Sequence, residues 1–406
     1  GRFANCRIYR RDFSRADRSG NSRNNRRLGE EKIKNAIFKN GMREKFYITT
    51  PIYYANDVPH IGHACTTIRT DVLARWNRIQ GKKVFFSTGM DEHGSKIQKR
   101  ASEFKKDPQI FVDEISFRFK NLWEQLNISY DGFIRTTDEK HKKIVEKVLN
   151  ELYKRGSIYK GIYKGFYCVG CEQFLTKSQL IDGKCPDHNK EPEILEEENY
   201  LLKMSDIQGN LIEKIESDEL KIIPETRKNE ILSFLKNQKL EDVSISRNKK
   251  NVSWGVPLVF DKNHITYVWV DAFLNYLTVL DWDGDLNNIP DFFPPDIQLM
   301  SKDILRVHAT IWPSILIHLG LPLPRQLYIH GYILSGGKKM SKTLGNVIDP
   351  FDLIDRYGVD AVRYYLLREI TPFEDGDITE EKFKEAYNAN LANGLGNLVA
   401  RIMKMS

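Results

Sequence analysis

A strand followed directly by an amphipathic helix sets the strongest limit on what this chain can fold into. The segment "KFYITTPIYY" at 45–54 is rich in β-branched and aromatic residues, and apolar residues at helical spacing follow Pro59 up to a stop at Gly81. The same logic continues with a buried strand expected at 83–89, a helix at 107–126 that opens with Asp107 as N-cap and Pro108 in its first turn, and another helix at 139–154. This βαβα order predicts an α/β domain with a Rossmann-like parallel sheet and crossover helices.

The pattern changes after residue 157. The stretch "GSIYKGIYKGFYCVGC" is short, glycine-punctuated and aromatic, which favours hairpins, whereas strand-then-helix order resumes at "ITYVWVDAFLNYL". We therefore expect an α/β domain in two halves, 43–157 and 264–370, interrupted by an insert at 158–263. Residues 371–406 are expected to be helical.

Residues 1–42 differ from the rest in charge. They hold nine Arg and three Lys against four acidic residues, an excess larger than the net charge of +7 of the whole chain. With little apolar periodicity, this basic extension is expected to be disordered. Three interpretations of this extension stay open. It is an arm that touches RNA, an Arg-rich organellar transit segment, or translated upstream sequence in front of a true translation start at Met42.

Two compositional observations bear on the compartment. No run approaches eighteen apolar residues, and no apolar stretch with a charged flank opens the chain, so we expect no membrane segment and a cytoplasmic protein. Five cysteines, three of them within eighteen positions, indicate a metal cluster in a reducing compartment rather than a disulfide framework.

The cysteine cluster has the spacing of a tetrahedral zinc site. It reads Cys168-x2-Cys171-x13-Cys185-x2-His188, two knuckles that each bring two side chains together from one tight turn. Four protein ligands leave no open position for water, so one structural Zn²⁺ per chain is predicted. The alternative is a set of ordinary buried thiols and a surface histidine.

Two histidines stand at the start of a predicted helix that follows a strand. The motif is "PHIGHA", with His60 and His63, and Gly62 between them would let a nucleobase or ribose approach the backbone closely. Helix amides at the edge of an open α/β sheet bind anions, which favours a phosphate ligand here.

A lysine-rich stretch, "GGKKMSKTLGN" at 336–346, would suit the same ligand. It is not a P-loop, because Tyr332 rather than glycine stands six residues before Lys338. Alone it reads as a solvated basic loop, whereas together with "PHIGHA" it indicates a nucleotide site with two sides.

The two motifs together resemble the HIGH and KMSKS signatures of class I aminoacyl-tRNA synthetases. The segments "YITTPIYYANDVPHIGHA", "TGMDEHG", "DVSISR", "TYVWVDAFLNYL", "KDILRVHATIWP" and "GKKMSKTLGNVIDP" follow, with the zinc spacing, in the order typical of the methionyl-tRNA synthetase family. The resemblance runs from about Phe46 to Ala400. Two departures are Ser301, where the family usually has Gly, and Thr343 for the last Ser of the lysine motif.

The resemblance implies a ligase of protein biosynthesis that activates methionine with ATP and Mg²⁺ and transfers it to tRNA(Met). It implies catalytic roles for His60, His63, Lys339 and Lys342. It implies that ATP binds these four together with Gly62 and Asp303. It implies a methionine pocket formed by Ile52, Tyr54, Asp91, Trp269, Phe273, Tyr276, Ile304 and His308. Residues 371–406 then correspond to the start of a helical stem and anticodon-binding domain, truncated at Ser406.

Two other functions stay open. Another class I-like nucleotidyl-transferring enzyme would share "PHIGHA" but would need neither the zinc knuckles nor the helical tail. A catalytically silent tRNA-binding paralogue should have lost the histidines or the lysines, and all four are present. Leucine, isoleucine and valine enzymes are disfavoured because the insert is too short for their editing domain.

Overall fold

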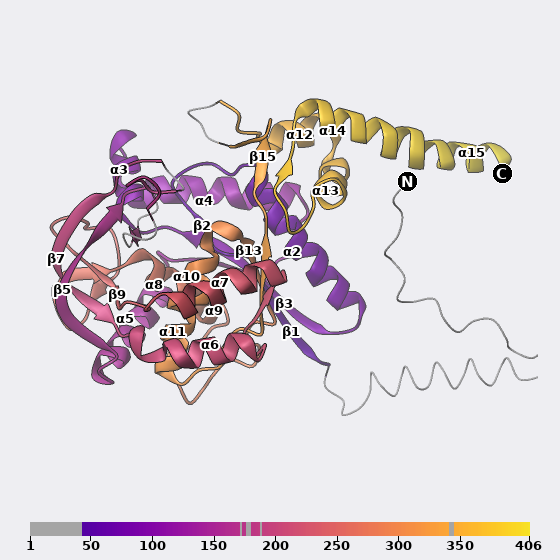
Figure 1. The fold of residues 1–406 in the computed structure, drawn as a ribbon. Coiled ribbons are helices and arrows are strands. Elements are labelled where there is room, and N and C mark those ends of the chain that lie inside the picture. The colour runs from indigo at the N-terminus through magenta and orange to yellow at the C-terminus, as the bar shows by residue number, and fades with distance from the viewer. Residues whose placement is uncertain (1–42, 171–172, 176–179, 187–188, 341–344) are drawn as a thin grey trace, which may run out of the picture. The chain divides into compact units, whose positions relative to one another are not determined.

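The computed structural model describes residues 43–170, 173–175, 180–186, 189–340 and 345–406. The chain separates into two units, Gly1–Glu44 and Lys45–Ser406, and the helices and strands labelled in Figure 1 belong to the second unit. The predicted disorder of the basic extension 1–42 concerns residues outside the described ranges and stays a prediction.

A seven-stranded sheet forms the centre of this unit. The strands run in the order β2–β3–β1–β13–β14–β8, with β4 paired to β3, and every pairing is parallel. The strands are β1 (Lys45–Thr49), β2 (Tyr53–Tyr54), β3 (Lys83–Asp91), β4 (Gly132–Arg135), β8 (Lys221–Ile223), β13 (Ile297–Ser301) and β14 (Gln326–His330). The predicted Rossmann-like parallel sheet is therefore confirmed.

Helices cover both faces of the sheet (Figure 1). On one face Ala74 of α2 packs with Ile48 and Phe86 of the strands. On the opposite face Met300 of β13 belongs to a core cluster with Trp312. The first face carries α2 (Ile61–Ile79), α4 (Pro108–Gln125) and α13 (Val359–Arg368), and the second carries α5 (Glu139–Lys154), α8 (Val268–Phe273), α9 (Asn275–Thr278) and α11 (Ile311–Leu319).

The helix boundaries follow the capping signals in the sequence. The side chain of His60 accepts a hydrogen bond from the Gly62 amide at the start of α2, and Gly81 adopts a positive φ just after the helix ends. Asp107 caps α4 through the Gln109 amide, with Pro108 in the first turn. The helices predicted from these signals are confirmed.

The segment between the two halves of the parallel sheet forms antiparallel sheets, as its hairpin-like sequence indicates. One sheet contains β5 (Ile158–Cys168), β6 (Gln173–Leu175), β7 (Glu193–Leu202) and β9 (Val243–Ser244), and another contains β10 (Ser246–Asn248), β11 (Pro257–Leu258) and β12 (Asp261–Thr266). Helices of the same segment are η2 (Ser205–Ile207), α6 (Gln208–Glu216) and α7 (Glu225–Asn237). The boundaries 158–263 stay a prediction, and β8 from within them completes the edge of the central sheet beside β14.

A smaller three-stranded sheet, β16–β15–β17, follows β14. It comprises β15 (Ile333–Ser335), β16 (Lys338–Lys339) and β17 (Gly376–Asp377). The strand β17 lies within 371–406, which the sequence predicted to be helical throughout, because two residues give no periodicity to detect. After β17 come α14 (Glu380–Ala386), the π-helix η5 (Tyr387–Gly396) and α15 (Asn397–Met405), which confirm the helical C-terminal region.

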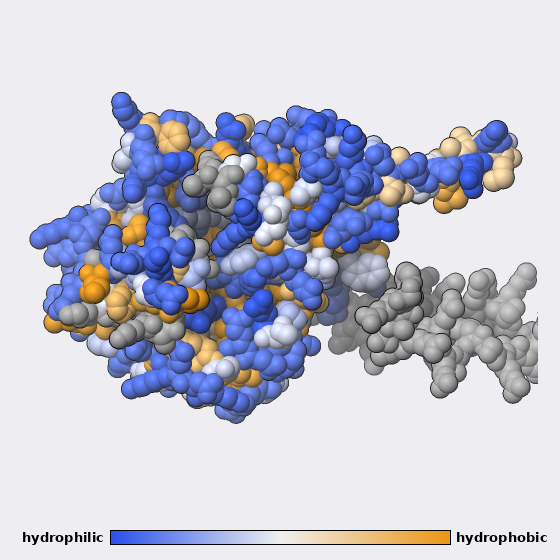
Figure 2. Space-filling model, turned by 45° about the horizontal axis from the view of Figure 1, so that its top comes forward, coloured by the Kyte–Doolittle hydropathy of each residue, from blue (hydrophilic) through white to orange (hydrophobic). Residues whose placement is uncertain are grey.

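The remaining helices are short or lie at the edges of the unit. They are α3 (Ser95–Glu103), η3 (Lys302–Ile304), α10 (Leu305–Ala309) and α12 (Pro350–Tyr357). Figure 2 shows hydrophobic and hydrophilic residues side by side on the projecting C-terminal helix, where Leu398, Ile402 and Met405 are exposed. Within the described ranges, none of the helices has both the length and the hydropathy that crossing a bilayer requires.

Candidate active site

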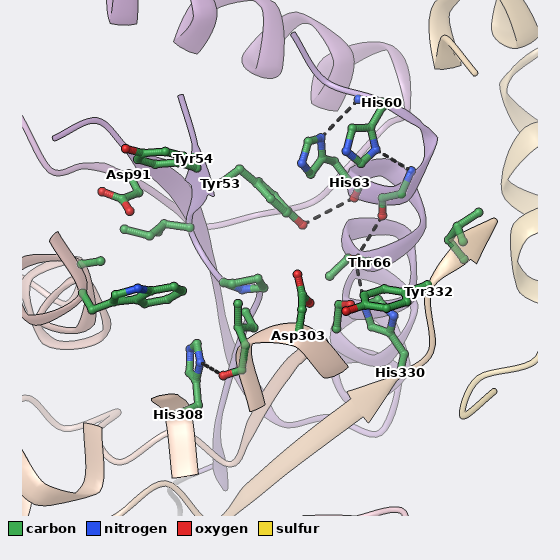
Figure 3. Close-up of a pocket in the computed structure, with 18 of the residues that line it drawn as sticks. Tyr53, Tyr54, His60, His63, Thr66, Asp91, Asp303, His308, His330 and Tyr332 are labelled. Carbon is green, nitrogen blue, oxygen red and sulfur yellow. Dashed lines mark hydrogen bonds between the residues drawn. The ribbon is translucent and has the colours of Figure 1, made fainter. Parts of the chain in front are cut away.

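One cavity of about 440 Å³ opens where the central strands end (Figure 3). Its lining includes Pro51–Tyr54 after β1, Asp91 at the end of β3, Asp303 after β13 and His330–Tyr332 after β14. The carboxyl ends of parallel strands form the edge at which open α/β sheets bind their ligands. The position of the cavity is therefore the one that the topology of the parallel sheet predicts.

The residues predicted to bind ATP and methionine share this one cavity. Among the described residues, all of those predictions lie in its lining: Ile52, Tyr54, His60, Gly62, His63, Asp91, Trp269, Phe273, Tyr276, Asp303, Ile304, His308 and Lys339. Lys342 lies outside the described residues. Their individual roles stay predictions, but residues almost 290 positions apart in sequence do border one space.

His60 and His63 form a stacked pair at the start of α2, with ring centroids 3.7 Å apart. The Nδ1 atom of His60 accepts from the amide of Gly62 at 3.1 Å, and Nδ1 of His63 accepts from the amide of His60 at 3.2 Å. Because a backbone amide can only donate, a neutral ring in either position carries its proton on Nε2. Burial lowers the pKa of His60 to about 4, and burial together with His60 lowers the pKa of His63 well below its usual value.

Gly62 is required by this arrangement. A Cβ atom built at residue 62 would lie 2.9 Å from Cε1 of His60. A side chain there would displace the imidazole that caps the helix. The glycine therefore serves the packing of the histidine ring, whereas the sequence suggested only close approach of a ligand.

Thr66 and His330 connect the histidine helix to β14. The Oγ1 atom of Thr66 lies 2.9 Å from Nε2 of His330, and Nδ1 of His330 lies 2.7 Å from the carbonyl oxygen of Gly331. Since a carbonyl can only accept, Nδ1 carries the proton and Nε2 is an acceptor facing the threonine hydroxyl, whose one proton it shares with the Gly62 carbonyl 3.1 Å away. Burial lowers the pKa of His330 to about 4, which keeps this neutral tautomer.

The opposite end of the cavity is a slot lined by aromatic rings. The ring centroid of Phe273 is 5.9 Å from that of Trp269 and 4.9 Å from that of His308. His308 donates through Nδ1 to the carbonyl of Ile304 at 2.9 Å, so its Nε2 accepts from the Tyr276 hydroxyl, also at 2.9 Å. Burial lowers the pKa of His308 to about 4 and raises the pKa of Tyr276. The slot is apolar and carries no net charge on its histidine.

Lys339 borders the cavity, and its role in binding ATP stays a prediction. Its Nζ atom is 4.5 Å from the ring centroid of Tyr332, and Nζ of Lys302 is 4.4 Å from the same centroid. Lys302 also forms an ion pair with Asp375 at 2.7 Å. The Tyr332 ring thus makes cation–π contacts with two ammonium groups near the place where phosphates are predicted to bind.

Two of the four predicted zinc ligands, Cys168 and Cys185, belong to the described residues. Cys168 and Cys185 are 3% and 1% exposed and share a small core of their own. A two-residue turn at Asp182–Gly183, with both φ values positive, lies one residue before Cys185. The other two predicted ligands, Cys171 and His188, lie outside the described residues, and among the rest no group of three or more candidate ligands gathers.

Sequence reasoning missed several residues of the lining. Lys96 of α3 borders the cavity and donates to the carbonyl of Gly170, which brings the first cysteine turn to the cavity wall. Thr66, His330 and Tyr332 were also missed. For His330 a signal existed, since it follows the largely apolar run "QLYI" at 326–329, and ligand contacts collect at the strand ends of a parallel sheet.

Comparisons with known proteins agree on one family. A family profile described as tRNA synthetases class I (M) matches residues 46–193 and 188–403. A methionine–tRNA ligase of Clostridium acetobutylicum is 48% identical over 364 residues, covering 89% of this chain and 56% of the relative. A methionine–tRNA ligase of Streptomyces coelicolor is 44% identical over 369 residues, covering 89% of this chain and 68% of the relative. The chain thus spans little more than half the length of the Clostridium relative.

Solved structures give the same result. Mycobacterium tuberculosis methionyl-tRNA synthetase in complex with methionyl-adenylate superposes with a TM-score of 0.84 at 38% identity, covering 89% of this chain and 72% of the other. The apo form of the same enzyme superposes with a TM-score of 0.74 at 35% identity, covering 89% and 69%.

Proposed function

The chain belongs to the methionyl-tRNA synthetase family of class I tRNA synthetases, and from this premise we propose that it activates methionine with ATP and transfers it to tRNA(Met). The observation that carries the proposal is the single cavity that joins the stacked histidines and Lys339 to the aromatic slot of Trp269 and Phe273. A site for two substrates that react with one another needs both in one space.

The first step is attack of the methionine carboxylate on the α-phosphorus of ATP, which releases pyrophosphate and leaves methionyl-adenylate. No protein nucleophile is required, so the work of the residues is alignment and stabilisation of charge on the phosphates. We assign that work to the Nε2 protons of His60 and His63 and to the ammonium of Lys339, with ATP bound as its Mg²⁺ complex. Lys342 and Asp303 complete the proposed ATP contacts.

The slot suits an uncharged thioether. Sulfur gains about 0.3–1.5 kcal/mol against an aromatic ring, and Trp269, Phe273 and Tyr276 provide three rings. The neutral His308 adds no charge that would have to be desolvated. The Asp91 carboxylate, 8% exposed at the end of β3, is the proposed partner of the α-ammonium group.

We also propose one structural Zn²⁺ held by Cys168, Cys171, Cys185 and His188. The chemistry of the donor set fits zinc, and the joint burial of Cys168 and Cys185 after a tight Asp182–Gly183 turn suits a closed site. When bound, the metal would supply folding energy to the segment around β5 and β7. Gly170, between two of the proposed ligands, accepts a hydrogen bond from Lys96 at the cavity wall, and the metal would take part in no chemical step.

Methionine-dependent exchange of pyrophosphate into ATP tests the proposed activity. Exchange with methionine well above that with leucine or cysteine is expected, and preference for either of the other two would refute the assignment. Charging of tRNA with the methionine anticodon tests the second step. A catalytically silent tRNA-binding paralogue would bind tRNA without any exchange.

A further inference from the structure

A two-glycine turn determines where Lys339 lies. Gly336 and Gly337 have φ values of 62° and 72° and connect β15 to β16, which pair antiparallel with Leu334 opposite Lys339. Consecutive positive φ values give the tight turn that matches the twist of a hairpin. Lys339 and Met340, directly after this turn, border the cavity. Any rotation of the turn would move both.

The turn is held from outside the hairpin by Asp377. One carboxylate oxygen of Asp377 accepts a hydrogen bond from the amide of Gly337 at 2.7 Å. The strand β17 that carries Asp377 pairs parallel with β15, Leu334 opposite Asp377. Asp375, two residues earlier, accepts from the amide of Tyr332 at 2.9 Å at the other end of β15. The two aspartates thus each accept a hydrogen bond from the backbone at one end of the segment Tyr332–Gly337, which leads to Lys339.

The second oxygen of Asp377 has a different partner. It lies 2.6 Å from Nζ of Lys382 in α14, and the Asp377 side chain is 25% exposed. The Gly337 amide, followed by Lys382, lowers the pKa of Asp377, so the carboxylate is charged at neutral pH. One side chain therefore joins the glycine turn to the first helix after β17.

We infer that Asp377 is a positioning residue for the ATP side of the cavity, which fixes the Gly336–Gly337 turn and through it the place of Lys339. The inference rests on the proposed function and goes beyond it, because Asp377 borders no part of the cavity. Its effect should reach ATP and pyrophosphate but not methionine, because the aromatic slot is formed by residues of α8, α9 and α10.

The test compares Asp377→Asn with Asp377→Ala in pyrophosphate exchange, with separate titrations of ATP and methionine. Asparagine keeps an acceptor for the Gly337 amide but loses the charge and the second oxygen that pairs with Lys382, so its KM for ATP should rise about two- to threefold. Alanine loses the acceptor, and its KM for ATP should rise roughly five- to tenfold. The KM for methionine should stay within about twofold of wild type in both variants.

Glu385→Gln is the matched control. Glu385 lines a surface groove that also contains Glu369, Glu374, Asp375 and Asp377. In the described part of the chain, no hydrogen bond joins Glu385 to the hairpin. Its removal should leave both KM values unchanged, which separates the specific contact from the loss of one negative charge nearby. The inference is overturned if Asp377→Ala leaves ATP kinetics unchanged, or if its KM for methionine rises as much as that for ATP.

A binding measurement separates this inference from the proposed function. Calorimetric titration with Mg²⁺–ATP alone needs no turnover. If wild type shows no exchange with any amino acid while Asp377→Ala still weakens ATP binding, the proposed activity fails and the positioning role stands. If exchange is normal and ATP binding is equal in both proteins, only the positioning role fails.

Discussion

The Nδ1 atom of His93 lies 2.6 Å from a carboxylate oxygen of Asp271, behind the aromatic slot. The other oxygen of Asp271 is 2.9 Å from Nε2 of His141, whose Nδ1 in turn lies 2.8 Å from the Thr278 hydroxyl. Burial alone would raise the pKa of Asp271, but the two histidines outweigh it and lower the pKa to about 2. The helix α8, which carries Trp269 and Phe273, is thereby fastened to β3 and α5.

Asp271→Asn should weaken the attachment of α8, the helix that carries Trp269 and Phe273 of the aromatic slot. The asparagine amide has one oxygen where the carboxylate has two, so it can accept from only one of the two histidines. The other buried histidine loses its acceptor, which should lower the unfolding free energy by about 2–4 kcal/mol. The KM for methionine should rise more than the KM for ATP. Urea unfolding and pyrophosphate exchange measure the two effects. Asp281→Asn is the control, since Asp281 is 90% exposed and pairs only with Lys140 among the described residues.

Tyr276→Phe should weaken methionine binding with little change in fold. The change removes the hydroxyl that donates to Nε2 of His308 and leaves that buried nitrogen without its donor, at a cost of about 1 kcal/mol, or fivefold in KM for methionine. Tyr153→Phe, in a stacked pair with Phe260 far from the slot, should behave as wild type. Equal KM values for Tyr276→Phe and wild type would mean that the hydroxyl has no part in the slot.

Acidification should destabilise the fold through buried neutral histidines. His308 and His330 are 2% and 3% exposed, and their pKa values are lowered to about 4. Above pH 6.5 neither the folded nor the unfolded state binds the proton. Between pH 6.5 and 4 only the unfolded state does, so stability falls with falling pH by up to about 3 kcal/mol for each ring.

Urea unfolding at pH 7 and at pH 4.5 checks this dependence. His330→Gln removes one titrating ring, and the loss of stability on acidification should be smaller than in wild type. A wild-type free energy of unfolding that stays constant over this range would contradict the neutral state of the two rings.

Cys185→Ser should abolish zinc binding, because a tetrahedral site with three remaining ligands binds far more weakly. Metal analysis of purified protein should give one zinc per chain for wild type and none for the variant. Cys65→Ser is the matched control, since Cys65 is equally buried but packs in α2, in a different core cluster. Stoichiometric zinc in Cys185→Ser would contradict the four-ligand assignment.

Local signals were sufficient for the central fold. His60 at the start of a helix, Asp107 as a cap and Gly81 as a stop each act within one turn of chain, and the structure confirms the elements they delimit. The strands β8 and β17 were not predicted, because each is two or three residues long and exists through pairing with a distant strand.

In the candidate site, too, local signals predicted some residues, and long-range contacts determine the others. Many of the residues that border the cavity were predicted from the motifs and the family resemblance, whereas the groups that hold them in place were not. His141 and Asp271 are 130 positions apart, and Asp377 and Gly337 are 40 apart. Nothing local in the sequence distinguishes these side chains from ordinary surface or core residues, since their partners are defined only by the tertiary fold.

The pairing of β8 with β14 limits how the protein can be dissected. The segment 158–263 looks like a removable cassette, but it contributes the outermost strand of the central sheet through Lys221–Ile223. Excision would expose the hydrogen-bonding edge of β14, a row of unpaired amides and carbonyls on an apolar strand, to other chains. A shortened protein designed to retain only the two α/β halves would therefore tend to aggregate unless a replacement strand were supplied at that edge.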